Sequence, residues 1–429
     1  MGDKRQGSNA RVSSQQHKTL KGMQDILPPD VFFWQKMEQT ARQIFSVYGF
    51  QEIRTPIMEA TTVFSRSIGE NTDIVEKEMY TFTDKGDRSV SLRPEGTASV
   101  VRSYVEHHLD KLPAPQKFYY SGPMFRYERP QSGRFRQFYQ IGVEAFADSS
   151  PRMDAEVIAM LERLLSAIGL KGISFQLNSI GCEQCRPEYR DALLDFFSEK
   201  KENLCDDCKR RYDKNPLRIL DCKASACQEQ RQGAPKITDH LCKDCRSHFI
   251  KLQELLSLLK VSYSLNPEMV RGLDYYTGTI FEVTSQSLGA QNAVAAGGRY
   301  DRLVKEFGGP QTPAIGFALG MERVLELLKK TELQISPSPS AFFAVLGDAA
   351  GSACLVLAEQ LRRQGHWVEV GDAASSLKSQ MRRADRMAVR YVFIMGDDEL
   401  RSGIVKWKNL VETGQGELKI TDVELFLAG

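Results

Sequence analysis

The feature that most constrains the fold is a pair of long strand-like runs in the first half of the chain. KFYYSGPMFRYE (residues 117–128) and FRQFYQIGVEAF (residues 135–146) are joined by the polar loop RPQSGR, which predicts a long antiparallel hairpin. Because alternate residues of a strand share a face, one face of the second run is mostly apolar and suits a core. The other face carries Arg134, Arg136, Phe138, Gln140, Gly142 and Glu144, with Arg126 on the partner strand.

This polar face has two interpretations. A solvated sheet face shows the same alternation of polar and apolar residues. The functional alternative is a pocket for a ligand with phosphate at one end and N–H groups at the other, since the planar guanidinium of arginine binds phosphate oxygens in a bidentate manner. Within the sequence there is no G-x-x-x-x-G-K-[ST] phosphate loop, so a phosphate site would need arginines of this kind.

The length and composition of the chain limit its class. At 429 residues the chain is too long for one domain of about 100–200 residues. A net charge of +2 neither demands nor excludes a nucleic-acid partner, so a basic surface would have to be local. No apolar run approaches the roughly 20 residues of a membrane span, and the N-terminus is not a secretory signal. We therefore expect a cytoplasmic protein without a membrane partner, whose cysteines are thiols or metal ligands.

The order of the elements predicts several domains. Residues 1–18 are polar and indicate a disordered extension, whereas residues 19–330 mix strands and helices around the hairpin. A charged, cysteine-rich insertion over 182–260 interrupts this domain. The Ser/Pro-rich residues 331–340 predict a linker, and the βαβαβ pattern of 341–429 predicts a small α/β domain.

Local patterns predict individual elements of the large domain. Apolar steps of three and four predict a helix over 30–48, and GFQEIRTPIME (49–59) reads as one strand. Residues 268–285 carry strand signals, AAGGRYD (295–301) a Gly-rich turn, and 314–328 a strand followed by a helix.

Eight of the nine cysteines lie in the insertion at metal-ligand spacing. They form four pairs, namely Cys182 with Cys185, Cys205 with Cys208, Cys222 with Cys227, and Cys242 with Cys245. Such pairs are strong zinc signatures in a reducing compartment, so we expect one or two structural zinc ions, each held by four thiolates. The simplest grouping joins the first two pairs and then the last two, but interleaved groups, unligated thiols and redox disulfides stay open. The lone Cys354 is expected in a core.

Several segments resemble a known family. GFQEIRTPIME, FRYERP with the strand after it, and GFALGMERV resemble, in order, the three signature motifs of class II aminoacyl-tRNA synthetases. RGLDYY and AAGGRYD resemble the motifs particular to histidyl-tRNA synthetases, and LRPEGT, KGMQDILPPD and EKEMYTF also match. The resemblance spans about residues 19–429. It implies an α+β class II catalytic domain built on an antiparallel sheet, with the cysteine-rich insertion, and a C-terminal α/β anticodon-binding domain.

The resemblance implies a histidine–tRNA ligase that uses ATP with Mg²⁺, forms AMP and acts as a homodimer, with Pro56 of the first motif near the subunit interface. Arg126 would hold the α-phosphate of ATP, Arg134 the outer phosphates, and Arg323 would stack on adenine. Arg271 would touch the histidine carboxylate and the α-phosphate, so Arg271 and Arg126 are the catalytic candidates. A fixed guanidinium offsets the charge that gathers where a carboxylate attacks phosphorus.

The resemblance also assigns a histidine site. It places Glu95, Thr97 and Gln140 at the ammonium group, Glu144 and Tyr276 at the imidazole, and Tyr275 and Tyr300 in the same pocket with Arg271. On its own, a carboxylate at a helix start such as Glu95 is as well explained by solvation there.

The transfer RNA would be held at two places. Gln131 and Arg136 lie in and after the hairpin loop, and Lys378, Arg382 and Arg386 form a basic stripe that suits RNA phosphates, although a solvated helix face looks the same. The insertion would lean on the acceptor arm, so metal loss should impair tRNA charging more than adenylate formation. The main alternative is a regulatory paralogue that binds histidine to control a biosynthetic enzyme; such paralogues typically lack the C-terminal domain.

Overall fold

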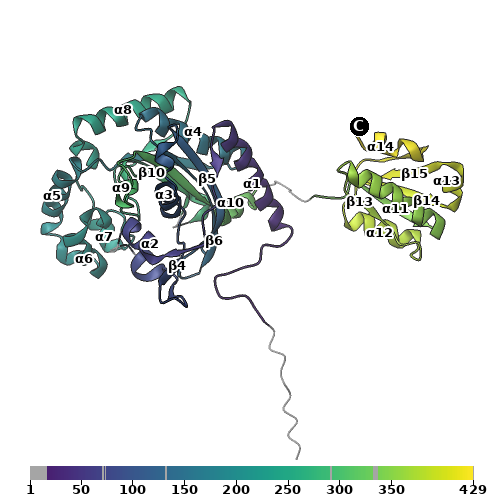
Figure 1. The fold of residues 1–429 in the computed structure, drawn as a ribbon, viewed down its shortest axis with the longest axis horizontal. Helices are drawn as coiled ribbons and strands as arrows, with labels where there is room; N and C mark the ends of the chain where they lie inside the picture. The colour runs from purple at the N-terminus through teal and green to yellow at the C-terminus, as the bar shows by residue number, and fades with distance from the viewer. Residues whose placement is uncertain are drawn as a thin grey trace, which may run out of the picture. The chain divides into compact units, whose positions relative to one another are not determined.

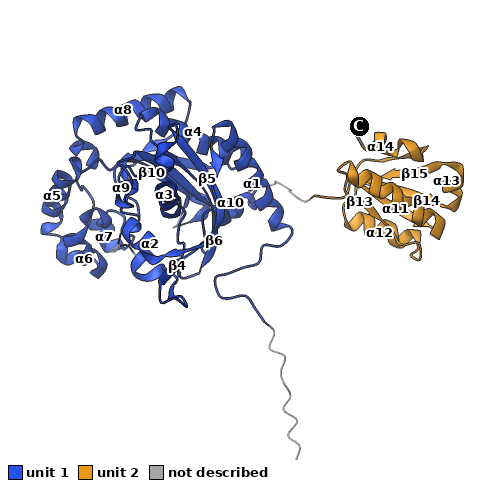
Figure 2. Cartoon of the chain, viewed as in Figure 1, with its two compact units in different colours: residues 1–333 blue, residues 334–429 orange. Residues whose placement is uncertain are grey.

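The protein is described by a computed structural model, which covers residues 17–69, 72, 74–130, 133–289, 292–331 and 337–428. Residues 1–16 of the expected extension and 332–336 of the expected linker lie outside these described residues. The chain divides into two compact units, residues 1–333 and residues 334–429 (Figure 2).

A sheet of eight strands forms the centre of the first unit (Figure 1). Its strands, in spatial order, are β1 (Gln51–Glu52), β5 (Gln116–Phe125), β6 (Gln137–Phe146), β11 (Ala314–Gly320), β10 (Ala293–Arg299), β9 (Thr277–Ser285), β7 (Ile173–Ser179) and β8 (Ser264–Leu265). Neighbours are antiparallel except at the two edges, where β1 pairs with β5 and β8 with β7 in parallel. The expected antiparallel core is therefore confirmed, and its edge strands make the sheet mixed.

The predicted hairpin is confirmed, and its alternation separates the two faces of the sheet. β5 and β6 pair antiparallel from Gln116 opposite Phe146 to Phe125 opposite Gln137. The apolar side chains of β6 are buried towards the layer formed by α1 (Asp30–Val47), α4 (Pro151–Ile168) and α10 (Met321–Leu328). On the opposite face lie α2 (Thr61–Ile68), α3 (Thr97–Glu106) and the short α9 (Leu303–Glu306), with the candidate site residues.

Three local expectations are corrected. The run 49–59 is not one strand: β1 ends at Glu52, and β2 (Met58–Ala60) belongs to a separate small sheet with β4 (Ser89–Leu92) and β3 (Thr81–Thr83). Pro56 lies in the break, where it has no N–H to donate to a strand pair. The Gly-rich segment is largely strand β10, not a turn, because Gly297 faces the backbone of β11 so closely that a Cβ would lie 2.3 Å from the carbonyl oxygen of Gly316.

The third correction concerns residues 268–276, which carry strand signals but do not form a strand. Pairing starts only at Thr277, because backbone groups of this segment bond to the end of α2 and to side chains instead. The N–H of Asp274 donates to the carbonyl of Ile68 at 3.1 Å, and the Asn178 amide donates to the carbonyl of Met269 at 3.0 Å. The segment thus runs across the face of the sheet that carries the candidate site.

The insertion forms helices between β7 and β8, namely α5 (Cys185–Ser198), α6 (Asp206–Lys214), α7 (Ser225–Gln230) and α8 (Lys243–Leu258). Helix α8 packs against α4 (Figure 1). The fully buried Asp154 of α4 joins the two parts, since its carboxylate lies 2.8 Å from His248 of α8 and 2.6 Å from Arg299 of β10. The insertion is therefore anchored to the same helix that covers the sheet.

The second unit has the predicted α/β order. Strands β12 (Ala341–Leu346), β13 (Val368–Val370) and β14 (Tyr391–Gly396) are parallel and are connected through α11 (Asp348–Arg363) and α12 (Leu377–Arg386). An antiparallel hairpin that the sequence did not predict, β15 (Ile404–Asn409) and β16 (Gly414–Lys419), extends the sheet beside β14. Cys354 is buried in the core of this unit. Among the described helices, none combines the length and apolar character that a membrane crossing requires.

Candidate active site

A cavity of about 540 Å³ opens on the sheet face that carries the polar row of β6. All of the side chains expected to bind histidine or ATP line it. They are Glu95, Thr97, Arg126, Arg134, Gln140, Glu144, Arg271, Tyr275, Tyr276, Tyr300 and Arg323. They come from β6 and the loop before it, from the ends of β5 and β10, from α3 and the residues before it, from the 271–276 segment and from α10, so only the folded sheet brings them together.

Glu144 forms the floor of the cavity. It is only 1 % exposed, and hydroxyls of three residues donate to it. Thr97 reaches Oε1 at 2.7 Å, Tyr120 reaches the same oxygen at 3.4 Å, and Tyr300 donates to Oε2. Opposite it lies Gly316 of β11, where a Cβ would lie 1.9 Å from Oε2, so only glycine leaves room for this carboxylate.

The environment of Glu144 favours its neutral form. Burial is the main cause, and it raises the pKa of Glu144 to about 8, despite the lowering effect of the Tyr300 and Thr97 hydroxyls. A ligand that brings a cation or an N–H donor would favour the carboxylate form instead.

Glu95 has a defined structural contact as well as a place in the cavity. It is 4 % exposed, and its two oxygens accept the backbone N–H groups of Thr97 and Ala98 at 2.8 Å, at the start of α3. The Tyr275 hydroxyl lies 3.5 Å from Oε2. Glu95 is therefore a buried cap of the helix rather than a solvated one, and burial raises its pKa.

Each arginine of the cavity is held by a partner. Arg126 donates Nε to the carbonyl of Pro94 at 2.9 Å and lies 5.2 Å from the centre of the Phe138 ring. The Arg323 guanidinium donates to the carbonyl of Ala293. These contacts restrict the guanidinium groups before any ligand arrives, which lowers the entropic cost of binding.

Two carboxylates that the sequence analysis did not single out also line the end of the cavity that carries the arginines. Glu282 of β9 lies 2.5 Å from Nη1 of Arg271, and Glu128 lies 2.6 Å from Nη1 of Arg134. Glu282 had a detectable signal, since it is the one charged residue in the apolar run of β9. Glu128 stands in FRYERP among other charged residues and had no such signal.

Gln140 offers an acceptor for a ligand. Its Oε1 is buried and has no hydrogen-bond partner among the described residues. A buried acceptor of this kind is costly unless something donates to it, so the position suits an ammonium or N–H group.

The insertion also reaches the cavity, which the sequence did not predict. Arg211, Arg218, Asp221, Cys222 and Lys223 line it. They lie about 50 residues before RGLDYY in the sequence, and nothing in their local pattern marks them as site residues.

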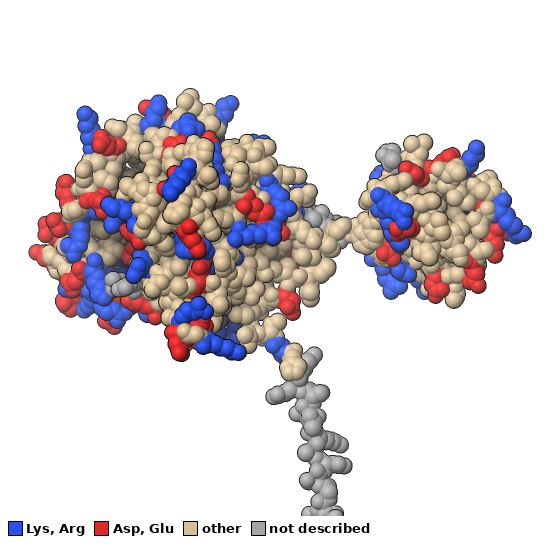
Figure 3. Space-filling model, in the orientation of Figure 1, with Lys and Arg blue, Asp and Glu red and all other residues tan. Residues whose placement is uncertain are grey.

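The residues expected to bind RNA lie elsewhere. Gln131 lies outside the described residues, and Arg136 does not line the cavity but stacks on Tyr127, 3.7 Å from the ring centre. Lys378, Arg382 and Arg386 are exposed on α12 of the second unit, and within the described chain none of them forms an ion pair with a carboxylate. Figure 3 shows basic side chains gathered over the part of this unit where Figure 1 draws α12.

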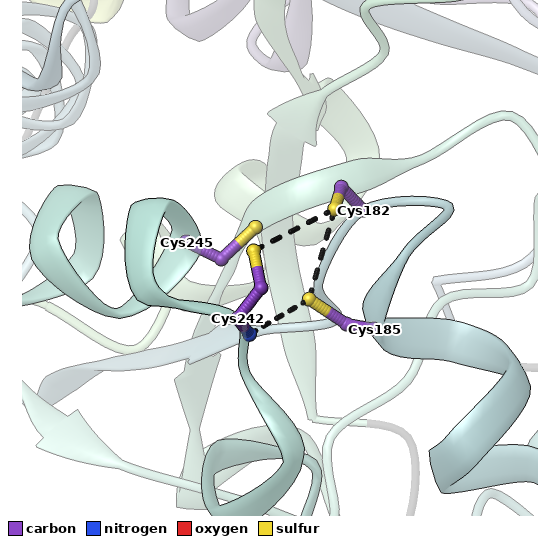
Figure 4. Close-up of side chains that lie close together, drawn as sticks. All are labelled: Cys182, Cys185, Cys242 and Cys245. Atoms are coloured by element: carbon purple, nitrogen blue, oxygen red, sulfur yellow. Dashed lines mark hydrogen bonds between the residues drawn. The ribbon is translucent and has the colours of Figure 1, made fainter.

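The cysteines form two groups of four, but not in the simplest grouping. The outer cysteine set is Cys182, Cys185, Cys242 and Cys245 (Figure 4), and the inner cysteine set is Cys205, Cys208, Cys222 and Cys227. The consecutive grouping is wrong because α5 runs for 14 residues, about 21 Å, between the first pair and the second. The outer set joins the first and the last cysteine pairs of the insertion. The inner set joins the two pairs that lie between them in the sequence.

Comparison with known proteins agrees with this geometry. The sequence model of the family described as Histidyl-tRNA synthetase matches residues 22–324, which is most of the chain. The chain belongs to the histidyl-tRNA synthetase family. A second model, described as Anticodon binding domain, matches residues 340–428.

Individual members of the histidyl-tRNA synthetase family match over nearly their whole length. The chain is 52 % identical to a protein named Histidine--tRNA ligase from Thermodesulfovibrio yellowstonii, over 95 % of this chain and 97 % of that one. It is 54 % identical to a protein of the same name from Trichlorobacter lovleyi, over 92 % and 94 %. The crystal structure of apo histidyl-tRNA synthetase from S. aureus superposes with a TM-score of 0.81 at 36 % identity, over 96 % of this chain and 100 % of that one.

The buried state of Glu144 predicts a pH-dependent effect of Glu144→Gln in the ligand-free protein. With a folded pKa of about 8 and an ordinary unfolded carboxyl pKa near 4.3, the folded wild type keeps a proton that the unfolded chain loses. Wild-type stability is therefore lost as pH rises through this window, by up to about 1.4 kcal/mol per pH unit, whereas an amide does not titrate. Denaturant unfolding at pH 5.5 and 8 should show Glu144→Gln gaining stability relative to wild type as pH rises.

The exposed Glu199 supplies the matched control. Glu199→Gln removes one carboxylate from the surface of the same unit and should show no comparable trend. Equal pH slopes for Glu144→Gln and wild type would show that Glu144 is ionised in the folded protein.

Proposed function

We propose that the chain activates histidine with ATP, bound as its Mg²⁺ complex, to histidyl-adenylate and pyrophosphate, and then transfers histidine to the 3′ end of its tRNA. The observation that carries the proposal is one cavity with arginines at one end and buried carboxylates and tyrosines at the other. Membership of the histidyl-tRNA synthetase family supports it.

In the first step a carboxylate oxygen of histidine attacks the α-phosphorus of ATP. The bond from that phosphorus to the oxygen bridging to the β-phosphate breaks, and pyrophosphate leaves. Both reactants are anionic, so fixed cations at the reacting centre lower the barrier most. Arg126 and Arg271 would act there, and Glu282 would orient Arg271 through their 2.5 Å ion pair.

The ATP molecule would lie along the arginine end. Arg134 would hold the outer phosphates and Arg323 would stack on adenine, because its planar guanidinium can lie flat on a ring. Mg²⁺ would arrive with the phosphates, as it usually does when phosphate oxygens supply part of its coordination.

The histidine molecule would lie at the carboxylate end. Glu95, Thr97 and the unpaired Oε1 of Gln140 suit the ammonium group, and Glu144 with Tyr276 suits the two imidazole nitrogens. Tyr275 and Tyr300 would fix these groups. An amino acid without ring N–H groups would leave buried polar atoms unpaired, which is the basis for rejecting it.

The second step needs the RNA. The exposed stripe of Lys378, Arg382 and Arg386 would contact anticodon-arm phosphates, and Gln131 and Arg136 of the hairpin would contact the acceptor end. Transfer then joins the histidine carbonyl to a 3′-terminal hydroxyl of the tRNA and releases AMP.

We further propose structural zinc in the insertion and activity in the cytoplasm, where thiols stay reduced.

A homodimer through the first motif is also proposed. Ile57 and Met58, next to Pro56, are 44 % and 46 % exposed in the single chain, so both are accessible for contact with a second chain. Light scattering at micromolar concentration should give the mass of two chains, and a monomer with full activity would contradict this.

ATP–pyrophosphate exchange with each amino acid tests the proposed function. We expect exchange with histidine alone, followed by transfer of histidine to its tRNA. Exchange with another amino acid but not histidine would overturn the substrate. Histidine binding without any exchange would favour the regulatory paralogue.

Variants of α12 distinguish the activation of histidine, measured by exchange, from its transfer to tRNA. Replacing Lys378, Arg382 and Arg386 together by alanine should leave exchange unchanged, since these residues lie in the other unit, and should raise the KM for tRNA in a salt-dependent manner. The matched control is Arg363→Ala on α11, which removes an exposed arginine already paired with Glu359. Equal charging by the triple variant and this control would remove the stripe from the RNA contact.

Arg271→Ala should lower the rate of activation far more than it weakens histidine binding. Loss of one preorganised donor at a developing charge typically costs about 3–4 kcal/mol, or roughly 10²–10³ in kcat. Arg271→Lys should also be slow, because an ammonium group lacks the planar fork. Single-turnover adenylate formation measures the step, and a near wild-type rate for the alanine variant would exclude the proposed role.

A further inference from the structure

We infer that both cysteine sets bind zinc, and that the two zinc centres fix the segment Arg271–Tyr276 in the catalytic cavity from its two ends. The metal would then support histidine activation itself. The link to activation rests on the proposed function, whereas metal binding by the cysteines does not.

The sulfur atoms of each set are spaced for one tetrahedral ion. All four Sγ atoms of a set lie within 4.8 Å of one another. Sγ of Cys182 is 3.7 Å from that of Cys185 and 3.9 Å from that of Cys242, and Sγ of Cys205 is 3.8 Å from that of Cys222. A zinc ion about 2.3 Å from each of four sulfurs requires sulfur–sulfur distances of about 3.8 Å. A disulfide would require about 2.05 Å.

The backbone around the sulfurs favours anionic ligands. Cys185, Cys205 and Cys242 stand at the starts of α5, α6 and α8, where the helix dipole favours negative charge. The N–H of Cys242 donates to Sγ of Cys185 at 3.1 Å, and that of Cys205 to Sγ of Cys227 at 3.3 Å. Such bonds orient sulfur ligands, as the surroundings of a metal site usually do.

The inner cysteine set also supplies the buried side chains of two short helices. In α6 only Cys208 is buried, and in α7 only Cys227 is buried. Because short helices are marginally stable in isolation, α6 and α7 depend on contacts with the rest of the insertion. Ligation through these two cysteines would supply such contacts, as structural zinc does in small domains.

The outer cysteine set leads to one end of the histidine-binding segment. Arg186, which follows Cys185 in α5, donates to the carbonyl of Tyr276. The N–H of Gly278 donates to the carbonyl of Gly181 at 2.9 Å, directly before Cys182. The position of the outer set therefore determines where the chain leaves Tyr276 and enters β9.

The inner cysteine set leads to the other end. Cys222 itself lines the cavity, and Arg218, four residues earlier, donates Nη1 to the carbonyl of Arg271 at 2.9 Å. Asn215 donates to Asp274 at 3.3 Å. Asn215 and Arg218 lie in the chain between Cys208 and Cys222. If one metal ion bound both cysteines, it would hold the two ends of this stretch together, so loss of the metal would release the contact between Arg218 and Arg271.

Loss of either centre should therefore weaken the binding of histidine. The prediction from the sequence is different, namely that metal loss would impair tRNA charging more than adenylate formation. An unfolded fraction lowers kcat and leaves KM unchanged, whereas a displaced Arg271–Tyr276 segment raises the KM for histidine. The KM thus separates positioning from general instability.

The test uses the full chain purified without chelator, with zinc and iron measured by elemental analysis. Wild type should hold two zinc ions per chain, and Cys245→Ser and Cys208→Ser one each. Cys354→Ser, the same change at the buried cysteine outside both sets, is the matched control and should hold two.

In exchange assays, Cys208→Ser and Cys245→Ser should raise the KM for histidine at least about tenfold, a loss of about 1.4 kcal/mol.

Arg218→Ala tests the link without touching a ligand. It should keep both zinc ions and still raise the KM for histidine, and Arg218→Lys should restore part of the affinity.

Less than half a zinc per chain in wild type, or iron in its place, would overturn the metal assignment. One zinc in Cys208→Ser with a wild-type KM, or a wild-type KM in Arg218→Ala, would overturn the positioning. Wild type with two zinc ions but without histidine-dependent exchange would refute the proposed function alone.

Discussion

The structure of the first unit depends on the alternation of side chains along its central antiparallel strands. In β6 every second residue packs against the layer of α1, α4 and α10, and Phe138, Gln140 and Glu144 between them face the cavity. A shift of one residue in register would bury Gln140 and Glu144 under the helices and expose the apolar set. Glycines keep the cavity open at this register, because a side chain on Gly316 would occupy the position of Glu144.

Buried charges then tie the remaining parts to this sheet. Asp154 joins α4 to β10 through Arg299 and to the insertion through His248. Breaking a buried pair of this kind typically costs about 3–5 kcal/mol, since it leaves the other charge without a partner. The same elements that hold the sheet together thus also place the insertion beside the cavity.

Much of this arrangement could be predicted from the sequence. The hairpin, α1 and the βαβαβ order of the second unit follow from local periodicity, and the family motifs led to the side chains that line the cavity. The predictions failed where tertiary contacts override local pattern. AAGGRYD is glycine-rich because two strands approach closely, not because it turns, and residues 268–276 look like a strand although their backbone bonds to the end of α2 and to side chains.

The sequence by itself determined which chemical groups the protein has: arginines and carboxylates on one face of a strand, and eight cysteines in four pairs. Only the tertiary structure decided how they combine. It grouped the cysteines as a nested pair of sets, placed Glu282 against Arg271 and Glu128 against Arg134, and brought Arg218 of the insertion to the carbonyl of Arg271. All of these contacts cross between different elements or loops, and those of the cysteine sets and of Arg218 join residues far apart in the chain, whereas spacing along the sequence constrains only neighbours within one element.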